Sequence, residues 1–327
     1  MASYDQAIAL RPDYADAHFF KGLSSLVTGD FERGWIEYEW RRKAPSARIT
    51  KRDFPQPLWL GKDDIAGKTI LFHSEQGFGD TIQFCRYVPL VAARDVHVMI
   101  EVEEPLRELM TGLAGATKVI VKGDPLPNFD FQCPLPSLPL AFKTRLETIP
   151  SSAPYLRVPK QALEYWGALL GTKRSLRIGL AWAGNAKHVR DRERSMRLRD
   201  LLPLLDIDAT FVSLQKEVRA GDAETLTSCN MLRFGQELGN FSDTAALISQ
   251  LDLVISVDTS VAHLAGALGK PVWILLTHAP DWRWLLDRDD SPWYPSARLF
   301  RQRETREWSS VTMRVREELL EFTGNER

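Results

Sequence analysis

Apolar positions follow two alternating spacings from residue 68 to the end of the chain. Short apolar runs predict strands, and stretches with apolar residues three or four positions apart predict helices. Strands that alternate with helices form parallel sheets covered by helices on both faces. A proline-rich stretch at 134–160 interrupts the alternation, so we expect an α/β protein with two Rossmann-like halves that face a cleft. The predicted strands are 69–73, 96–102, 118–121, 129–133, 177–182, 210–214, 231–234, 253–257 and 272–276, and the predicted helices are 81–93, 105–113, 198–205, 218–226, 244–250, the stretch between Ser260 and Gly269, and 311–322.

Residues 1–43 follow a different pattern, in which small residues and a proline recur at the spacing of a tetratricopeptide repeat. Ala7 and Pro12 match the end of one repeat. Four later residues match positions where the two helices of the next repeat touch. Such repeats bury their apolar faces against neighbouring repeats. We therefore expect an α-helical tetratricopeptide-repeat remnant that starts within a repeat, with a plain helical hairpin as the alternative. The matching positions are Ala7, Pro12, Gly22, Gly29, Gly34 and Tyr38.

These changes of pattern predict five segments. Residues 44–66 contain several prolines and no helical spacing, so we expect a linker between the helical repeat and the α/β part. The predicted segments are the helical repeat at 1–43, the linker at 44–66, a first Rossmann-like domain at 67–160, a second one at 161–308 and a C-terminal helix at 309–327.

Composition excludes several classes of function. The net charge of −1 provides no field that would attract nucleic acid, and no apolar run is long enough to span a membrane. The three cysteines lie far apart and match no metal-binding spacing, which indicates reduced thiols in a cytoplasmic protein. Two Asp-x-Asp sequences, at 206–208 and 287–289, follow no predicted strand, so we assign no metal and no cofactor.

The segment from Val254 to Arg283 contains the strongest functional pattern. An apolar strand leads directly into Asp258-Thr259-Ser260, and a helix of small residues follows. The N–H groups at the start of a helix bind phosphate well, and open α/β sheets bind ligands at the carboxyl ends of their strands. The segment therefore predicts an anion site near residue 259, with a nucleotide diphosphate as the expected ligand. His263 lies in the first turns of this helix, where it either serves the site or has a structural role.

A turn in the first half carries a second candidate. Gly77-Phe78-Gly79-Asp80 lies between the first strand and its helix, and its glycines allow the backbone to approach a ligand closely. The carboxylate of Asp80 could act as a general base toward a sugar hydroxyl. The alternative is an aspartate that only caps the helix.

Polar residues also follow two strands of the second half. The sequence Trp182-Ala183-Gly184-Asn185 leads into a basic stretch that includes Lys187 and Arg194, and a cationic loop at this edge could hold a diphosphate. Gln215 and Lys216 end the next strand, where base or ribose would bind. The alternatives are ion pairs within a solvated loop and the capping of a helix. An aromatic cluster around Arg283 either stacks on sugars and bases or packs under a long loop.

These patterns together resemble the bacterial heptosyltransferase-like glycosyltransferases of family 9, which have the GT-B fold. The resemblance covers roughly residues 68–322 and is most specific at 254–272. It implies that Asp80 activates the acceptor hydroxyl and that Gly77, Phe78 and Gly79 lie beside the acceptor. It also implies that the second half binds the diphosphate of the donor through Asp258, Thr259, Ser260, Val261 and His263. The family places a lysine in the loop where this chain has Lys187 and Arg194, and the layout behind helical repeats is similar to that of the O-linked N-acetylglucosamine transferases.

We therefore expect a metal-independent glycosyltransferase that moves a sugar from a nucleotide-diphosphate donor to a hydroxyl of a protein or glycan, with inversion implied by the resemblance. The nucleotide sugar would be a co-substrate, and the repeats could bind a protein acceptor or partner. Two alternatives remain open: a non-catalytic scaffold for protein interaction, and a nucleotide-sugar epimerase that needs no acceptor.

Overall fold

The computed structural model describes residues 1–325 and consists of two compact units. The first unit contains Met1–Ser151 and also takes in Pro280–Arg288, a segment far away in the sequence. The second unit contains Ser152–Ala279 and the chain from Asp289 onward. The chain therefore passes between the units three times.

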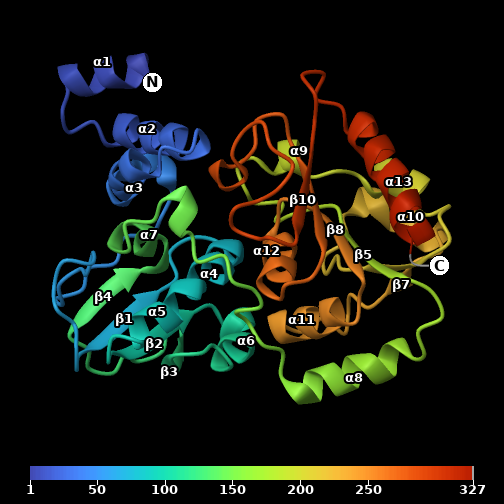
Figure 1. The fold of residues 1–327 in the computed structure, drawn as a ribbon, viewed down its shortest axis with the longest axis horizontal. Coiled ribbons are helices and arrows are strands. Elements are labelled where there is room, and N and C mark those ends of the chain that lie inside the picture. Colours follow the sequence, from blue (N-terminus) through green and yellow to red (C-terminus); the bar gives the residue numbers. More distant parts are fainter. Residues whose placement is uncertain (326–327) are drawn as a thin grey trace. The chain divides into compact units, whose positions relative to one another are not determined.

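The first unit begins with three helices, α1 (Ala2–Leu10), α2 (Ala15–Val27) and α3 (Phe31–Tyr38), which Figure 1 shows in blue. Helices α2 and α3 pack closely because glycines lie where they meet. A Cβ atom on Gly22 would lie 2.7 Å from the backbone nitrogen of Tyr38, and one on Gly34 would lie 2.5 Å from a methyl carbon of Leu26. Two short 3-10 helices follow, η1 (Glu39–Arg42) and η2 (Pro45–Ala47).

Gly22→Ala is expected to destabilise the packing of α2 on α3 by about 1–3 kcal/mol, because the backbone of Tyr38 leaves no room for a methyl group. Faster amide exchange in peptides from α2 and α3 would report this loss. Gly221→Ala is the matched control, since nothing lies within 4 Å of the new Cβ in that helix. Alanine is the better helix former there, so the control should be neutral or slightly stabilising. Equal protection in wild type and Gly22→Ala would contradict the packing argument.

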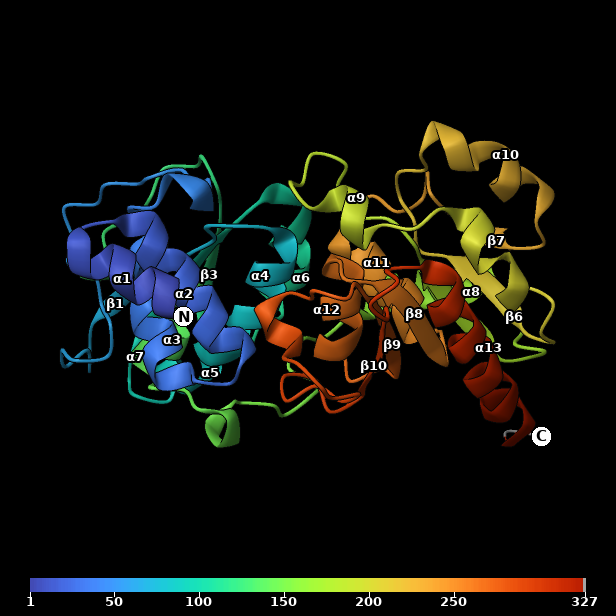
Figure 2. The ribbon, with the colours of Figure 1, turned by 90° about the horizontal axis from the view of Figure 1, so that it is seen from above.

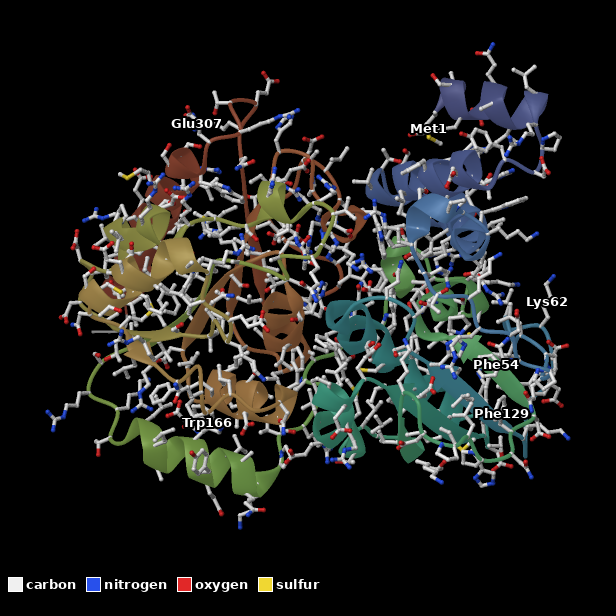
Figure 3. All side chains as sticks on the ribbon, turned by 180° about the vertical axis from the view of Figure 1, so that it is seen from behind. Met1, Phe54, Lys62, Phe129, Trp166 and Glu307 are labelled. Atoms are coloured by element: carbon white, nitrogen blue, oxygen red, sulfur yellow. The ribbon has the colours of Figure 1, made fainter. Side chains whose placement is uncertain are left out.

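The rest of the first unit is built on a four-stranded sheet in the order β3-β2-β1-β4, with all strands parallel. Its strands are β1 (Thr69–His73), β2 (His97–Val102), β3 (Ala116–Val121) and β4 (Phe131–Pro134). Phe54 and Phe129 lie close together over this sheet, with ring centroids 5.8 Å apart (Figure 3). The connecting helices are α4 (Phe78–Phe84), η3 (Cys85–Tyr87), α5 (Val88–Ala92), η4 (Glu104–Leu106), α6 (Arg107–Thr111), η5 (Leu135–Ser137), α7 (Leu138–Ala141) and η6 (Leu146–Thr148).

The second unit contains a six-stranded parallel sheet in the order β10-β9-β8-β5-β6-β7. Strands β5, β8 and β9 are buried along their whole length, which explains why they read as continuous apolar runs. The strands are β5 (Arg177–Ala181), β6 (Thr210–Ser213), β7 (Leu232–Arg233), β8 (Leu253–Val257), β9 (Val272–Leu276) and β10 (Ala297–Arg301).

Helices flank this second sheet. The last helix, α13 (Trp308–Asn325), packs its apolar side chains against η7 (Leu198–Leu204) and β10. In Figure 2, α13 is the dark red helix next to the C label. The indole of Trp166 in α8 (Lys160–Leu170) donates to Asp243 of α11 (Phe241–Ser249) over 3.2 Å and so holds these two helices together. Trp166 is labelled in Figure 3. The helices of the second unit are α8 (Lys160–Leu170), α9 (Asp191–Arg194), η7 (Leu198–Leu204), α10 (Ala220–Ser228), α11 (Phe241–Ser249), α12 (Ser260–Ala267) and α13 (Trp308–Asn325). The short helix η8 (Trp282–Trp284) belongs to the first unit.

The prediction of parallel sheets is confirmed, and several elements differ in detail. The helix expected at 81–93 is broken into α4, η3 and α5, because Pro89 cannot donate within a continuous helix and instead lies in the first turn of a new one. The helix expected at 198–205 is a 3-10 helix with Pro203 inside it. Strand β10 and helix α8 were not predicted. Within residues 1–325, no helix combines the length and the hydropathy needed to cross a membrane.

Candidate functional site

The candidate anion site in the second unit lies at the carboxyl ends of β8, β5 and β6. These strands are neighbours in the sheet, and Ala181 of β5 pairs with Ser256 of β8. The loops after Ala181 and Val257 therefore begin at the same edge. Parallel strands of this kind bind ligands at this edge. The residues singled out near 184 and near 259 are thus brought together by the sheet itself.

Thr259 begins helix α12. Its backbone is extended, and its hydroxyl accepts a hydrogen bond from the N–H of Val261 (3.3 Å). A side-chain cap at this position favours a helix start, and the partial positive charge of the helix N-terminus then faces the loop after β5. The methyl carbon of Thr259 lies 3.4 Å from the place that a Cβ on Gly184 would take. Ser260 and Val261 form the first turn of this helix.

Gly184 provides the space between this helix and a cation. A Cβ at Gly184 would lie 3.1 Å from Nη2 of Arg194 and close to Thr259, so a larger residue would fill the gap between them. The backbone N–H of Gly184 donates to Oγ of Ser195 (3.0 Å). Nε of Arg194 is buried and has no hydrogen-bond partner among the described residues. A guanidinium with an unused donor beside a helix N-terminus suits an anionic ligand.

A network that sequence reasoning missed fixes this loop. Arg219 donates to both carboxylate oxygens of Asp191 (2.8 and 2.7 Å) and to Oγ of Ser195 (3.1 Å). It also reaches the carbonyl oxygen of Gly184 (3.3 Å). Arg219 lies three residues beyond Lys216 and directly before helix α10. This position is the one sequence signal that could have identified it.

The other predicted donor-site residues serve mainly to shape the loops. The amide of Gln215 pairs with both backbone groups of Ala183 (3.1 and 3.0 Å), which joins the ends of β6 and β5. Lys216 donates to the carbonyl of Gly239 (2.7 Å). Asn185 accepts from the backbone N–H of Lys187 (2.9 Å), and the side chain of Lys187 is exposed. Trp182 is fully buried and donates its indole N–H to Asp222 (3.0 Å).

His263 is buried inside α12. Its Nδ1 lies 2.8 Å from the hydroxyl of Tyr294, and its Nε2 lies 3.9 Å from the carboxylate of Asp258. The ring therefore connects the end of β8 to the chain just before β10. Among residues 1–325, no group of three or more histidine, cysteine or acidic side chains is placed to hold a metal ion.

The glycine turn lies in the first unit, where Asp80 stands in the first turn of α4. Gly77 is the N-cap, and its N–H donates to Oδ2 of Asp80 (2.8 Å). Phe78 is about one-third exposed beside it, and Gly79 follows. The structure therefore realises the capping role. It also adds a partner, since the other oxygen of Asp80 forms an ion pair with Nη2 of Arg283.

Arg283 lies in the Pro280–Arg288 segment of the first unit and is buried. Its guanidinium also donates to the side chains of Asp281 (2.8 Å) and Gln83. Burial disfavours its charged form, but the carboxylates of Asp281 and Asp80 outweigh burial and raise the pKa of Arg283. The aromatic residues that lie near Arg283 in the sequence, Trp282, Trp284, Trp293 and Tyr294, are buried, so they pack inside the protein and do not present faces for sugars.

Comparisons with known proteins show what this chain is similar to. Residues 238–317 match glycosyltransferase family 9 (heptosyltransferase). The chain is 26% identical to the protein FlbA of Caulobacter vibrioides, and the alignment covers 96% of this chain and 56% of FlbA. The chain therefore spans about half the length of this relative.

Solved structures show the same fold. The family 9 glycosyl transferase of Veillonella parvula has a TM-score of 0.59 at 12% identity, with 79% of this chain and 98% of that chain covered. The ADP-heptose LPS heptosyltransferase II of E. coli has a TM-score of 0.56 at 16% identity, with 79% and 99% covered.

These findings confirm the fold of parallel sheets and support the prediction of a glycosyltransferase. The tetratricopeptide interpretation of residues 1–43, the predicted domain boundaries, the cytoplasmic location and the roles of single site residues stay predictions.

Proposed function

We propose that the chain is a glycosyltransferase that transfers a sugar from a nucleotide-diphosphate donor to a hydroxyl group of a protein or glycan. One observation carries this proposal. The N-terminus of α12, the gap at Gly184 and the guanidinium of Arg194 meet at the carboxyl edge of neighbouring parallel strands. That arrangement suits a diphosphate, and the family 9 match at residues 238–317 includes α12.

In the donor site, the diphosphate leaves the sugar and carries away the bonding electron pair. The helix N–H groups at residues 259–261 and the guanidinium of Arg194 would stabilise the negative charge that develops on it. The Asp191–Arg219 network would hold Ser195 and the Gly184 loop in place. Gln215 would hold the part of the site that binds the nucleobase in place beside this loop.

In the acceptor site, Asp80 would take the proton of the attacking hydroxyl. The hydroxyl oxygen would then form a bond to the anomeric carbon as the diphosphate departs, which is a single displacement with inversion. Because Arg283 binds the same carboxylate, the acceptor must share or displace that contact. We further propose that this reaction needs no metal and no cofactor, with cationic side chains neutralising the leaving group.

One contact favours the alternative of a non-catalytic scaffold. The ion pair between Asp80 and Arg283 occupies the carboxylate that would serve as the base. A scaffold of this kind would bind nucleotide and show no transfer, so the two readings differ in activity and not in nucleotide affinity.

The proposal is tested by thermal-shift measurements with ADP, UDP, GDP, CDP and their sugars. A ligand at a hundred times its Kd stabilises the folded protein by about 2.7 kcal/mol, so the correct nucleotide should raise the melting temperature clearly. Thr259→Glu should abolish the shift, because a carboxylate at the helix start repels the diphosphate. Thr172→Glu places the same charge at an exposed site of the second unit and should keep it. No shift with any nucleotide would count against the transferase.

A further inference from the structure

A pocket of about 450 Å³ opens in the first unit, where η1 and residues 49–60 meet the carboxyl ends of β1 and β4. This volume is within the range of sites that bind small molecules. Much of its wall comes from residues that precede position 68, where the family resemblance begins. The pocket is therefore built largely by the part of the chain that this resemblance does not explain.

His73 and Gln132 form the floor of the pocket, and one ring nitrogen of His73 is buried there without a hydrogen-bond partner among residues 1–325. His73 is 5% exposed, and its Nε2 lies 3.1 Å from Oε1 of Gln132. Because that amide oxygen accepts, Nε2 carries the proton and Nδ1 holds a lone pair. Burial lowers the pKa of His73 to about 4, so the ring is neutral near pH 7. Within residues 1–325, Nδ1 has no hydrogen-bond partner. A buried acceptor of this kind is best satisfied by a hydroxyl or amide of a ligand.

The rim of the pocket is positively charged. Among the acidic residues of its wall, Glu39 and Glu75 both bind the buried Arg41 (2.5 and 2.8 Å). Two of the cationic residues in the pocket wall are also paired. Arg52 forms an ion pair with Glu101, and Nζ of Lys122 lies 3.5 Å from a carboxylate oxygen of Glu103.

Three cations of the rim remain after these pairs. Arg42 and Lys51 make no ion pair among the described residues, and the ammonium of Lys43 lies 5.0 Å from the ring centroid of Trp40. The carboxylate of Asp53 stands against them in the wall, and Glu39 and Glu75 together carry one negative charge more than the Arg41 that they share. The rim therefore has an excess of one positive charge.

We propose that this pocket binds a small hydroxylated anion, such as a sugar that carries a phosphate or a carboxylate. A ligand hydroxyl donates to Nδ1 of His73, and the anionic group binds Arg42 and Lys51. A neutral sugar would form only the hydrogen bond to His73, and inorganic phosphate would contact only Arg42 and Lys51. The inference concerns binding to the first unit, so it holds whether or not Asp80 acts as a base.

The test is calorimetric titration of the full chain with glucose 6-phosphate, glucuronate, glucose and inorganic phosphate. At least one of the two sugar anions should bind about tenfold or more tightly than glucose and than phosphate. Only a sugar anion can contact His73 through a hydroxyl and Arg42 and Lys51 through its charged group. The better of the two identifies the anionic group as phosphate or carboxylate. Equal or weaker binding of both sugar anions compared with glucose would overturn the proposal.

Surface variants locate the site without disturbing the core. The double variant Arg42→Gln with Lys51→Gln should weaken binding of the sugar anion by about tenfold or more. The matched control is Lys62→Gln with Lys68→Gln, two exposed lysines of the first unit outside the pocket wall, and it should bind as wild type does (Lys62, Figure 3). Thr259→Glu should also keep the binding, which separates this site from the nucleotide site. Binding that survives the rim variant and is lost in Thr259→Glu would place the anion on the second unit and refute the inference.

Discussion

Asp80→Asn is expected to lower the rate of sugar transfer by about 10²–10⁴-fold and to leave nucleotide affinity unchanged. The amide keeps the size of the side chain and can still accept from the N–H of Gly77, so the start of α4 should stay intact. It cannot take up a proton from an acceptor hydroxyl. Arg283 loses one carboxylate but keeps Asp281, so its buried charge is still compensated. Steady-state transfer and nucleotide titration on the same preparation measure the two effects.

Asp63→Asn is the control for this experiment, since it changes an exposed aspartate of the first unit by the same single atom. It should transfer at the wild-type rate. Unchanged transfer in Asp80→Asn would show that Asp80 only caps its helix. Loss of both transfer and nucleotide affinity would indicate a general structural defect instead.

Trp282→Ala is expected to destabilise the first unit by about 3–5 kcal/mol, the usual cost of truncating a buried tryptophan. Trp282 is 4% exposed, and its ring lies 5.2 Å from that of Trp35 and 6.4 Å from that of Phe84, measured between centroids. The truncation would leave a cavity between the Pro280–Arg288 segment, α3 and α4. Amides of α2, α3 and α4 should then exchange faster, whereas those of β5 and β8 in the second unit should not.

The matched control lies four residues further along the same segment. Leu286 is 45% exposed, so Leu286→Ala removes apolar atoms that already contact water and should change amide exchange little. If the amides of α2 and α3 exchange as slowly in Trp282→Ala as in wild type, the Pro280–Arg288 segment does not stabilise the first unit.

The sequence predicts the parts of this protein whose signals are local. Strand β8 begins and ends at the predicted residues because its apolar run is bounded by Asp252 and Asp258. Thr259 is recognisable as a helix start because its side chain and the small residues after it obey a capping rule. The meeting of the 184 and 259 loops also follows from general rules, since neighbouring parallel strands share a carboxyl edge.

Contacts between residues that are remote in the sequence could not be predicted. Asp80 and Arg283 are paired although about two hundred positions separate them, and nothing in either local pattern indicates the other. The aromatic residues around Arg283 are equally compatible with ligand stacking and with packing, and only their burial decides for packing. Strand β10 was missed because its outward positions are arginines, so its apolar run is too short to stand out.

The passage of Pro280–Arg288 into the first unit also determines when that unit can finish folding on the ribosome. Proteins usually fold in order of synthesis, with N-terminal units complete before the following ones emerge. Here Trp35, Tyr38 and Phe84 must wait for Trp282, which is made only after most of the second unit. A nascent chain that ends near residue 151 therefore exposes an aromatic surface and an uncompensated Asp80. Neither unit is a continuous module, and a chimera that exchanges one of them must carry residues 280–288 with the first.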